Sequence, residues 1–252
     1  NPTKWLFPSS FIVPANGVAI IYCSGRNELI GANAHTNFKI TQTKGSEVFM
    51  LSDGGGVLQD SIRVFANQNS HTRGRETDGS AIWSVFVNGT PNATNVGAMQ
   101  EYTTTPIFSQ TGGYNSGAVN LTLSSPDPNT TIYYTINGDE PNNTSTIYIG
   151  AINIANTTVI KAICYSSDPT IPASFIDYHT FFINDTHTIP ILSVSGTQVD
   201  DLLSGPPFTN LEPEGTIEWF DENGILLDKG TGEYNKHGND SWAYNQRGFD
   251  YV

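Results

Sequence analysis

The stretch Thr131-Ile132-Tyr133-Tyr134-Thr135-Ile136-Asn137-Gly138-Asp139-Glu140-Pro141 decides the fold of this chain. From Ile132 to Ile136 every second side chain is Ile or Tyr and points to one face of an extended strand, because successive side chains alternate in direction. Asn137-Gly138 then supplies the positive φ angles that a tight turn after a strand needs. The stretch predicts a β-hairpin with an apolar inner face, and it carries neither a nucleophile nor a cluster of metal ligands.

The rest of the chain repeats this pattern. Short apolar or alternating runs are broken by Asn-Gly, Gly-Gly or Pro, and helical periodicity is almost absent outside 197–203, which Gly205-Pro206-Pro207 would end. With 37% hydrophobic and 14% charged residues, 24 Gly and 14 Pro, the composition also fits many short strands and turns. We expect an all-β fold, with strands at 18–23, 38–41, 47–52, 57–64, 81–87, 119–124, 131–136, 147–154, 159–166 and 175–183.

The charge of the chain restricts its partners. The net charge of −13 argues against nucleic acid or an anionic membrane as a partner. The basic residues are unevenly distributed, which is typical of separate modules joined in tandem. Seven of the eleven lie in the first 75 residues: Lys4, Arg26, Lys39, Lys44, Arg63, Arg73 and Arg75.

Two cysteines and several glycosylation motifs bear on the cellular compartment in which the protein is found. Cys23 and Cys164 each end an apolar strand pattern and fall in different proposed modules, so we expect buried free thiols. No run of about 18 apolar residues is present, so we expect no direct membrane insertion. Nine Asn-x-Ser/Thr motifs would be glycosylated only in a eukaryotic secretory pathway. They begin at Asn88, Asn92, Asn120, Asn129, Asn142, Asn143, Asn156, Asn184 and Asn239.

Residues 1–97 carry a first set of family motifs. These are Trp5-Leu6-Phe7-Pro8, His35-Thr36-Asn37-Phe38, Gly45-Ser46-Glu47-Val48-Phe49-Met50-Leu51 and Gly74-Arg75-Glu76-Thr77-Asp78-Gly79, with Trp83. Together they resemble the lamin-tail domain of secreted bacterial proteins. The resemblance implies an immunoglobulin-like β-sandwich from which the first strand or two are missing.

Residues 98–186 carry a second set, after a linker at 98–102. Pro106-Ile107-Phe108-Ser109, Val119-Asn120-Leu121-Thr122-Leu123, the opening hairpin and Thr158-Val159-Ile160-Lys161-Ala162 lie in one register. They resemble the C-terminal β domain of chitobiase and hexosaminidase. That resemblance implies a fibronectin-like sandwich.

Residues 187–252 differ from both. Ile189-Pro190-Ile191-Leu192-Ser193-Val194, Gly215-Thr216-Ile217-Glu218-Trp219-Phe220-Asp221 and Asn235-Lys236-His237-Gly238 resemble the entry strands of the CotH kinase-like family of atypical kinases. The nucleotide- and metal-binding positions of that family would lie beyond Val252, so none can be assigned. The fold expected for the whole is therefore two tandem immunoglobulin/fibronectin-like sandwiches followed by a partial, β-rich N-terminal piece of a third domain, all within a longer protein.

Two groups of residues could suggest hydrolysis. His237, Asp240 and Ser241 have the residue types of a catalytic triad, but three residues on one five-residue turn seldom reach the required mutual orientation. Five acids in the third module could pair for glycoside hydrolysis, although a solvated edge strand protected by charge is the simpler interpretation. These acids are Glu212, Glu214, Glu218, Asp221 and Glu222.

Metal binding has little support in the sequence. The turns 53–56, 137–140 and 221–224 are rich in oxygen ligands, yet none has EF-hand spacing, so calcium is only a weak possibility. The histidines are scattered without a nearby Cys, which argues against zinc. They are His35, His71, His179, His187 and His237. We expect no catalytic, cofactor-binding or metal-binding residues in this segment.

Three functions remain in competition. The first is a non-catalytic extracellular or cell-surface array that acts as a spacer, adhesion or presentation scaffold, with other domains of the same chain, surface glycans or surface proteins as partners. The second is the N-terminal half of a CotH-like atypical kinase. The third is a carbohydrate-binding accessory region with a stacking platform of Tyr114, Tyr133, Tyr148 and Trp242, although most aromatics of a sandwich, such as Trp5 and Trp83, would fill its core.

Overall fold

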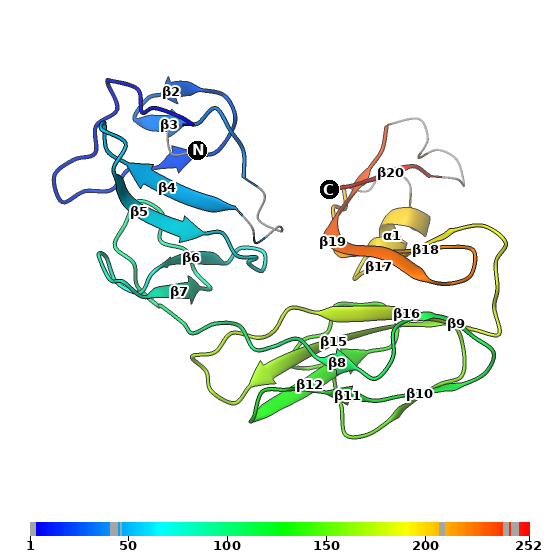
Figure 1. The fold of residues 1–252 in the computed structure, drawn as a ribbon. Coiled ribbons are helices and arrows are strands. Elements are labelled where there is room, and N and C mark those ends of the chain that lie inside the picture. Colours follow the sequence, from blue (N-terminus) through cyan, green and yellow to red (C-terminus); the bar gives the residue numbers. More distant parts are fainter. Residues whose placement is uncertain (1–3, 41–44, 46, 207–209, 239–241, 243–246) are drawn as a thin grey trace. The chain divides into compact units, whose positions relative to one another are not determined.

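The computed structural model describes residues 4–40, 45, 47–206, 210–238, 242 and 247–252 (Figure 1). Their regular structure is almost entirely short β-strands, with one short helix, α1 (Val199–Ser204). The predicted all-β fold class is therefore confirmed, as is a helix near 197–203. The chain divides into two units, Asn1–Glu101 and Tyr102–Val252.

The first unit contains three small sheets. β1, β3 and β2 form one sheet, and the β4–β5 and β6–β7 hairpins form two more. The Asp53 carboxylate closes the β4–β5 turn, because its Oδ1 accepts the backbone N–H groups of Gly55 and Val57, each at 2.9 Å. The strands are β1 (Ile21–Tyr22), β2 (Glu28–Ile30), β3 (Asn33–His35), β4 (Val48–Ser52), β5 (Leu58–Arg63), β6 (Thr72–Arg75) and β7 (Trp83–Phe86).

Some strand predictions for the first unit were wrong. Residues 38–40 form no strand and contribute only an isolated bridge from Lys39 to Ser24, while residue 41 lies outside the described residues. The strand predictions also missed β2, β3 and β6, which are only three or four residues long, and two of them contain residue types that are depleted in strands, Asn33 in β3 and Gly74 in β6. The predicted buried thiol at Cys23 is only partly buried, although it is free, as is the buried Cys164.

The second unit is built on a five-stranded sheet in the order β13-β12-β15-β16-β9. Two short pairs, β10–β14 and β11–β8, supply the opposing layer of a sandwich. These strands are β8 (Ile107–Phe108), β9 (Gly113–Asn115), β10 (Val119–Leu121), β11 (Leu123–Ser124), β12 (Thr130–Thr135), β13 (Thr146–Ile147), β14 (Ile152–Ile154), β15 (Thr158–Ser166) and β16 (Asp177–Ile183).

Alternation of side chains explains the core of this sandwich. On β10 and β14, Leu121 and Ile152 are buried, whereas Asn120 and Asn153 between the buried positions face solvent and bond to each other at 3.0 Å. The buried cluster also takes in one face of β15 and β16. Its members are Val119, Leu121, Leu123, Ile132, Ile152, Ile154, Ile160, Ala162, Cys164, Phe181 and Ile183.

The segment that predicts the hairpin is a strand, but its turn differs from the prediction. Ile132 is buried in the core, whereas Ile136 is 59% exposed beyond the strand end. Of the Asn137-Gly138 pair, only Gly138 has a positive φ, and the chain makes a ten-residue connection, 136–145, to β13 instead of a tight turn. Asn137 Oδ1 accepts the Asp139 N–H at 3.2 Å, so the Asn organises a local side-chain turn.

A second sheet completes this unit, with strands in the order β17-β18-β19-β20. The strands are β17 (Ile191–Ser195), β18 (Glu214–Phe220), β19 (Leu226–Lys236) and β20 (Phe249–Tyr251). Its small core contains Val199 and Leu202 of α1 with Tyr234 and Trp242. β18 pairs on both sides, so the prediction of a solvated edge strand was wrong.

We predict that Ile160→Ala lowers the free energy of unfolding of the second unit by about 3–4 kcal/mol, because it leaves a cavity in a packed core. Ile160 is 0% exposed. Ile149→Ala is the matched control, since Ile149 is 95% exposed and its truncation should change stability by less than about 0.5 kcal/mol. Urea unfolding measures both, and equal losses would contradict this core.

Candidate functional site

The strongest concentration of buried polar groups lies where the two sheets of the second unit meet. We call this contact of β15 and β16 with β17, β18 and β19 the joint. β15 is a nine-residue strand whose one face, with Ile160 and Ala162, belongs to the sandwich core. Its other face presents Lys161, which is also buried. A β-strand buried on both faces has to satisfy every polar group that it carries.

Lys161 anchors one end of the joint. Its Nζ donates to Glu140 Oε1 at 2.6 Å and to the Ser195 carbonyl of β17 at 3.2 Å. Burial lowers the pKa of Lys161 and raises the pKa of Glu140, and the opposite charge of each partner acts against these shifts. The Glu140 backbone N–H also donates to Thr197 Oγ1 at 3.2 Å. This ion pair therefore ties the loop after β12 to the second sheet.

Glu218 lies in the middle of the joint, on β18. It is 2% exposed, and its Oε2 accepts the Thr180 hydroxyl of β16 at 2.5 Å. Thr180 Oγ1 is also 2.7 Å from Ser193 Oγ of β17, so one hydroxyl links three strands. Burial raises the pKa of Glu218 to about 7, against the lowering effects of Thr180 and of the Lys229 charge.

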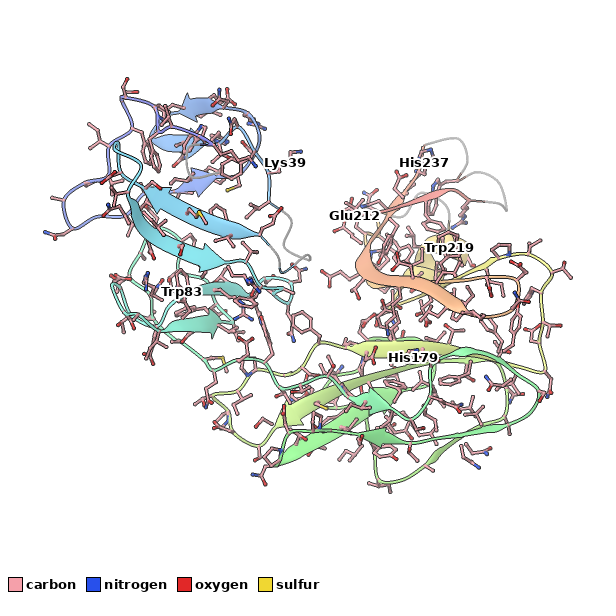
Figure 2. All side chains as sticks on the ribbon, viewed as in Figure 1. Lys39, Trp83, His179, Glu212, Trp219 and His237 are labelled. Atoms are coloured by element: carbon pink, nitrogen blue, oxygen red, sulfur yellow. The ribbon has the colours of Figure 1, made fainter. Side chains whose placement is uncertain are left out.

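His179 lies beside Glu218, with Nδ1 at 4.0 Å from Glu218 Oε1. That nitrogen accepts the Gly112 backbone N–H at 3.2 Å, and the ring packs edge-on against Phe108 at 4.8 Å between centroids. Burial and the charge of Lys229 together lower the pKa of His179 to about 4, against the raising effect of Asp177. Figure 2 labels His179 on the strand that faces the second sheet.

Apolar contacts and a second ion pair complete the joint. The rings of Phe182 and Phe220 meet edge to face at 5.2 Å. Lys229 Nζ lies 2.5 Å from Asp177 Oδ1 and also bonds to the Tyr178 carbonyl at 3.2 Å. Both partners of this pair are partly exposed, so the pair contributes less than its short distance suggests.

Shifted pKa values often mark catalytic groups, yet here they arise from burial between two sheets. Two hollows of the described residues are lined by other side chains, one around Phe49 and one around Tyr114. The arrangement is suited to holding two sheets together.

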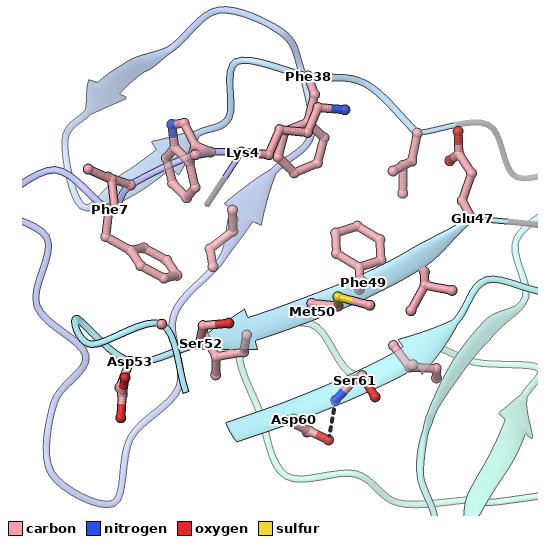
Figure 3. A pocket seen from close by; sticks show the side chains of 18 of the residues that line it. Lys4, Phe7, Phe38, Glu47, Phe49, Met50, Ser52, Asp53, Asp60 and Ser61 are labelled. Carbon is pink, nitrogen blue, oxygen red and sulfur yellow. Dashed lines mark hydrogen bonds between the residues drawn. The ribbon is translucent and has the colours of Figure 1, made fainter. Parts of the chain in front are cut away.

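The larger hollow is an open cleft of about 940 Å³ in the first unit (Figure 3). Aromatic rings supply much of its wall, from Trp5, Phe7, Phe38 and Phe49. Two carboxylates at its margin are engaged by the protein itself. Asp53 closes its own turn, and both oxygens of Asp60 lie 2.7 Å from Arg75, which holds the pKa of Asp60 below its ordinary value.

Each described residue of the two hydrolase interpretations is either engaged by another group or exposed. Asp240 and Ser241 lie outside the described residues, and His237 Nδ1 is 2.8 Å from Asp250 on β20. Of the five acids, Glu218 is buried in the joint. Glu212, Glu214 and Glu222 are exposed, and Asp221 Oδ1 accepts the N–H groups of Asn223 and Ile225 at 2.9 and 2.8 Å.

The oxygen-rich turns use their side chains locally. Asp53 and Asp221 accept backbone N–H groups of their own turns, and Asn137 Nδ2 lies 2.6 Å from Asp139 Oδ2. Among the described residues, no three His, Cys, Asp or Glu side chains gather in a way that could hold a metal ion.

The structure places the four proposed platform aromatics in different environments. Trp242 is fully buried beside Tyr234, and Tyr148 packs against the sandwich core. Tyr114 packs 5.6 Å from Phe182 at the joint, whereas Tyr133 is half-buried and meets Tyr165 at 5.5 Å. Trp83 of the first unit remains 38% exposed, with the Arg75 guanidinium 5.0 Å from its ring.

The joint was not predicted from the sequence. Two signals could have revealed it: Lys161 is the one charge inside the apolar run 159–164, and Glu218 lies within the apolar run 217–220. A charged residue inside an otherwise buried strand requires a partner. The partners Glu140 and Thr180 are distant in sequence, so no local pattern identifies them.

Comparison with known proteins bears on the sandwich that supports the joint. The fold belongs to the class of all-β modules, and residues 110–174 match the family described as Chitobiase/beta-hexosaminidase C-terminal domain. This match confirms the resemblance of the second module, while the lamin-tail and CotH-like resemblances stay predictions. No curated protein and no solved structure matched the chain. Among the described residues, no helix is long and apolar enough to cross a membrane.

We predict that Lys161→Met destabilises the second unit by about 2–4 kcal/mol, because Glu140 and the Ser195 carbonyl lose their donor. Glu140→Gln alone should cost less, since Glu140 is partly exposed. The double variant should lose less than the sum of the single variants in a double-mutant cycle measured by urea unfolding. Strict additivity would contradict the coupling of this pair.

Proposed function

We propose that the second unit is a non-catalytic presentation module, which holds its second sheet at a fixed orientation on a chitobiase-type β sandwich. The joint is the observation that carries this proposal. It combines a partly buried ion pair, a hydroxyl shared among three strands and an aromatic pair. A flexible linker would need none of these contacts.

The wider setting is part of the same proposal. The chain acts as a spacer, adhesion or presentation scaffold in a longer protein at the cell surface, without a cofactor. Its partners are other domains of the same chain, surface glycans or surface proteins. The acidic net charge of −13 and the Asn-, Thr- and Ser-rich surface support an exposed, soluble array. The CotH-like kinase remains an alternative for the full-length protein.

We predict a narrow distance distribution across the joint. Spin labels at Asn153→Cys on β14 and Glu212→Cys before β18, both exposed, report this distance by pulsed electron paramagnetic resonance. Cys23→Ser removes the partly buried thiol. Phe220→Ala should broaden the distribution, because it removes the ring that packs on Phe182.

Trp219→Ala is the matched control, since Trp219 is the neighbouring aromatic on β18 but is 47% exposed. Circular dichroism and amide spectra establish that each variant is folded. A broad distribution in the labelled protein without further changes would show that the sheets move independently, and the presentation role would then fail.

A carbohydrate-associated role is a second candidate, favoured by the family match over 110–174. Tyr133 and Tyr165 form a half-buried, edge-to-face pair on β12 and β15. Flat tyrosine rings offer apolar faces to sugars.

We predict that, if this role holds, the chain is retained on chitin or on a glycan array, and that Tyr133→Ala with Tyr165→Ala reduces retention at least about tenfold, as expected for the loss of about 1.4 kcal/mol. Tyr102→Ala is a control that leaves this pair intact. Absence of retention by the unaltered chain would exclude these glycans as ligands.

A further inference from the structure

The hydrogen bonds of the joint define the charge state of His179. Its Nδ1 accepts the Gly112 N–H at 3.2 Å, and a nitrogen that accepts a hydrogen bond carries no proton. Its Nε2 lies 3.8 Å from Asp177 Oδ2, beyond hydrogen-bond distance. With 5% exposure and the Phe108 ring against it, the imidazole has little solvation for a positive charge. His179 is therefore neutral in the folded unit.

Glu218 shows the complementary state. Its Oε2 accepts the Thr180 hydroxyl, whereas its Oε1 is buried without a hydrogen-bond partner among the described residues. An ionised carboxylate oxygen in that position would be desolvated and uncompensated. A protonated carboxyl avoids this cost. Glu218 therefore carries the proton that His179 lacks.

The neighbouring charged groups do not change the protonation states assigned to His179 and Glu218. β19 contributes Lys229, which is bonded to Asp177 of β16. β15 contributes Lys161, which is bonded to Glu140. Tyr178 of β16 also faces this region, and burial raises the pKa of its hydroxyl, so it stays neutral. Both lysines thus have other carboxylates as their hydrogen-bonded partners.

We propose that folding of the joint transfers one proton from the imidazole of His179 to the carboxyl of Glu218, so that the closed joint holds as many protons as the open chain. In water between the ordinary pKa values of 4.5 for Glu and 6.5 for His, the imidazole is charged and the carboxyl ionised. In the joint, both groups are neutral. One proton is present in each state, and none is exchanged with solvent.

The shifted pKa values give the consequence for stability. The raised pKa of Glu218, about 7, destabilises the folded unit as pH rises from 4.5 to 7. The lowered pKa of His179, about 4, destabilises it as pH falls from 6.5 to 4. These opposite trends nearly cancel, and together they change the unfolding constant by only about twofold between about pH 5 and about pH 7.5.

Two single-residue variants separate the contribution of Glu218 to the pH dependence of stability from that of His179. Glu218→Gln keeps the neutral form of the carboxyl, and His179→Asn keeps an acceptor for the Gly112 N–H. Relative to the unaltered 252-residue chain, the unfolding constant of Glu218→Gln should fall about 60-fold from about pH 5 to about pH 7.5, and that of His179→Asn should rise about 30-fold. Urea unfolding at each pH, monitored through the amide signals of β16 and β18, gives the unfolding constants from which these ratios are calculated.

Glu222→Gln is the control, because it removes an exposed carboxylate just beyond the end of β18 and leaves Glu218 and His179 in place, so it should reproduce neither trend. Ratios for Glu218→Gln and His179→Asn that are flat, or that move in the same direction, would overturn the proposal. Nuclear magnetic resonance of the unaltered chain provides a second test that needs no variant. At about pH 5.5 it should show a neutral His179 ring and a protonated Glu218 carboxyl, and an imidazolium–carboxylate pair would refute the transfer. These readouts measure protonation and stability, whereas the presentation role is tested by the distance distribution. Failure of one proposal can therefore be distinguished from failure of the other.

Discussion

Burial of both faces of β15 and β16 is the constraint on which the second unit depends. One face of this pair of strands closes an ordinary hydrocarbon core, with Ile160 and Phe181 at full burial. The other face carries Lys161 and Thr180, which the second sheet also removes from water. Because buried polar groups are costly without partners, the second sheet can dock only where it supplies hydrogen-bond acceptors for these two donors. Glu218 and the Ser195 carbonyl supply them.

The fold class could be predicted from the sequence, because the alternation of side chains along a strand and the choice of turn residues depend on only a few neighbouring positions. β10 and β14 show this, since their buried and exposed positions follow the alternation of apolar and polar residues. The strand 47–52 was also found, but the role of β18 was not. Its acids suggested an exposed edge, whereas β17 and β19 cover it on both sides. Pairing between strands distant in sequence decides which acid is buried, and a local pattern contains no information about that.

The candidate site was unpredictable for the same reason. Glu218 and Thr180 are 38 positions apart, and Lys161 and Glu140 are 21 apart. The first unit shows the opposite situation. There the apolar run of β4 was predicted correctly as a strand, yet Met50 and Leu51 remain about half exposed beside an open cleft. An apolar run predicts a strand, but it does not establish that the strand is covered.

The parallel pairing of β9 with β16 has a mechanical consequence. β9 lies near the start of the sandwich and β16 near its end, and their residues pair from Phe181 with Gly113 to Ile183 with Asn115. Tension applied to the two ends of this sandwich would pull these strands past each other along their length. In a parallel pair the hydrogen bonds are evenly spaced, so a load along the strands is distributed over the three residue pairs. We therefore expect this topology to resist stretching wherever a chain is anchored at one end and pulled at the other.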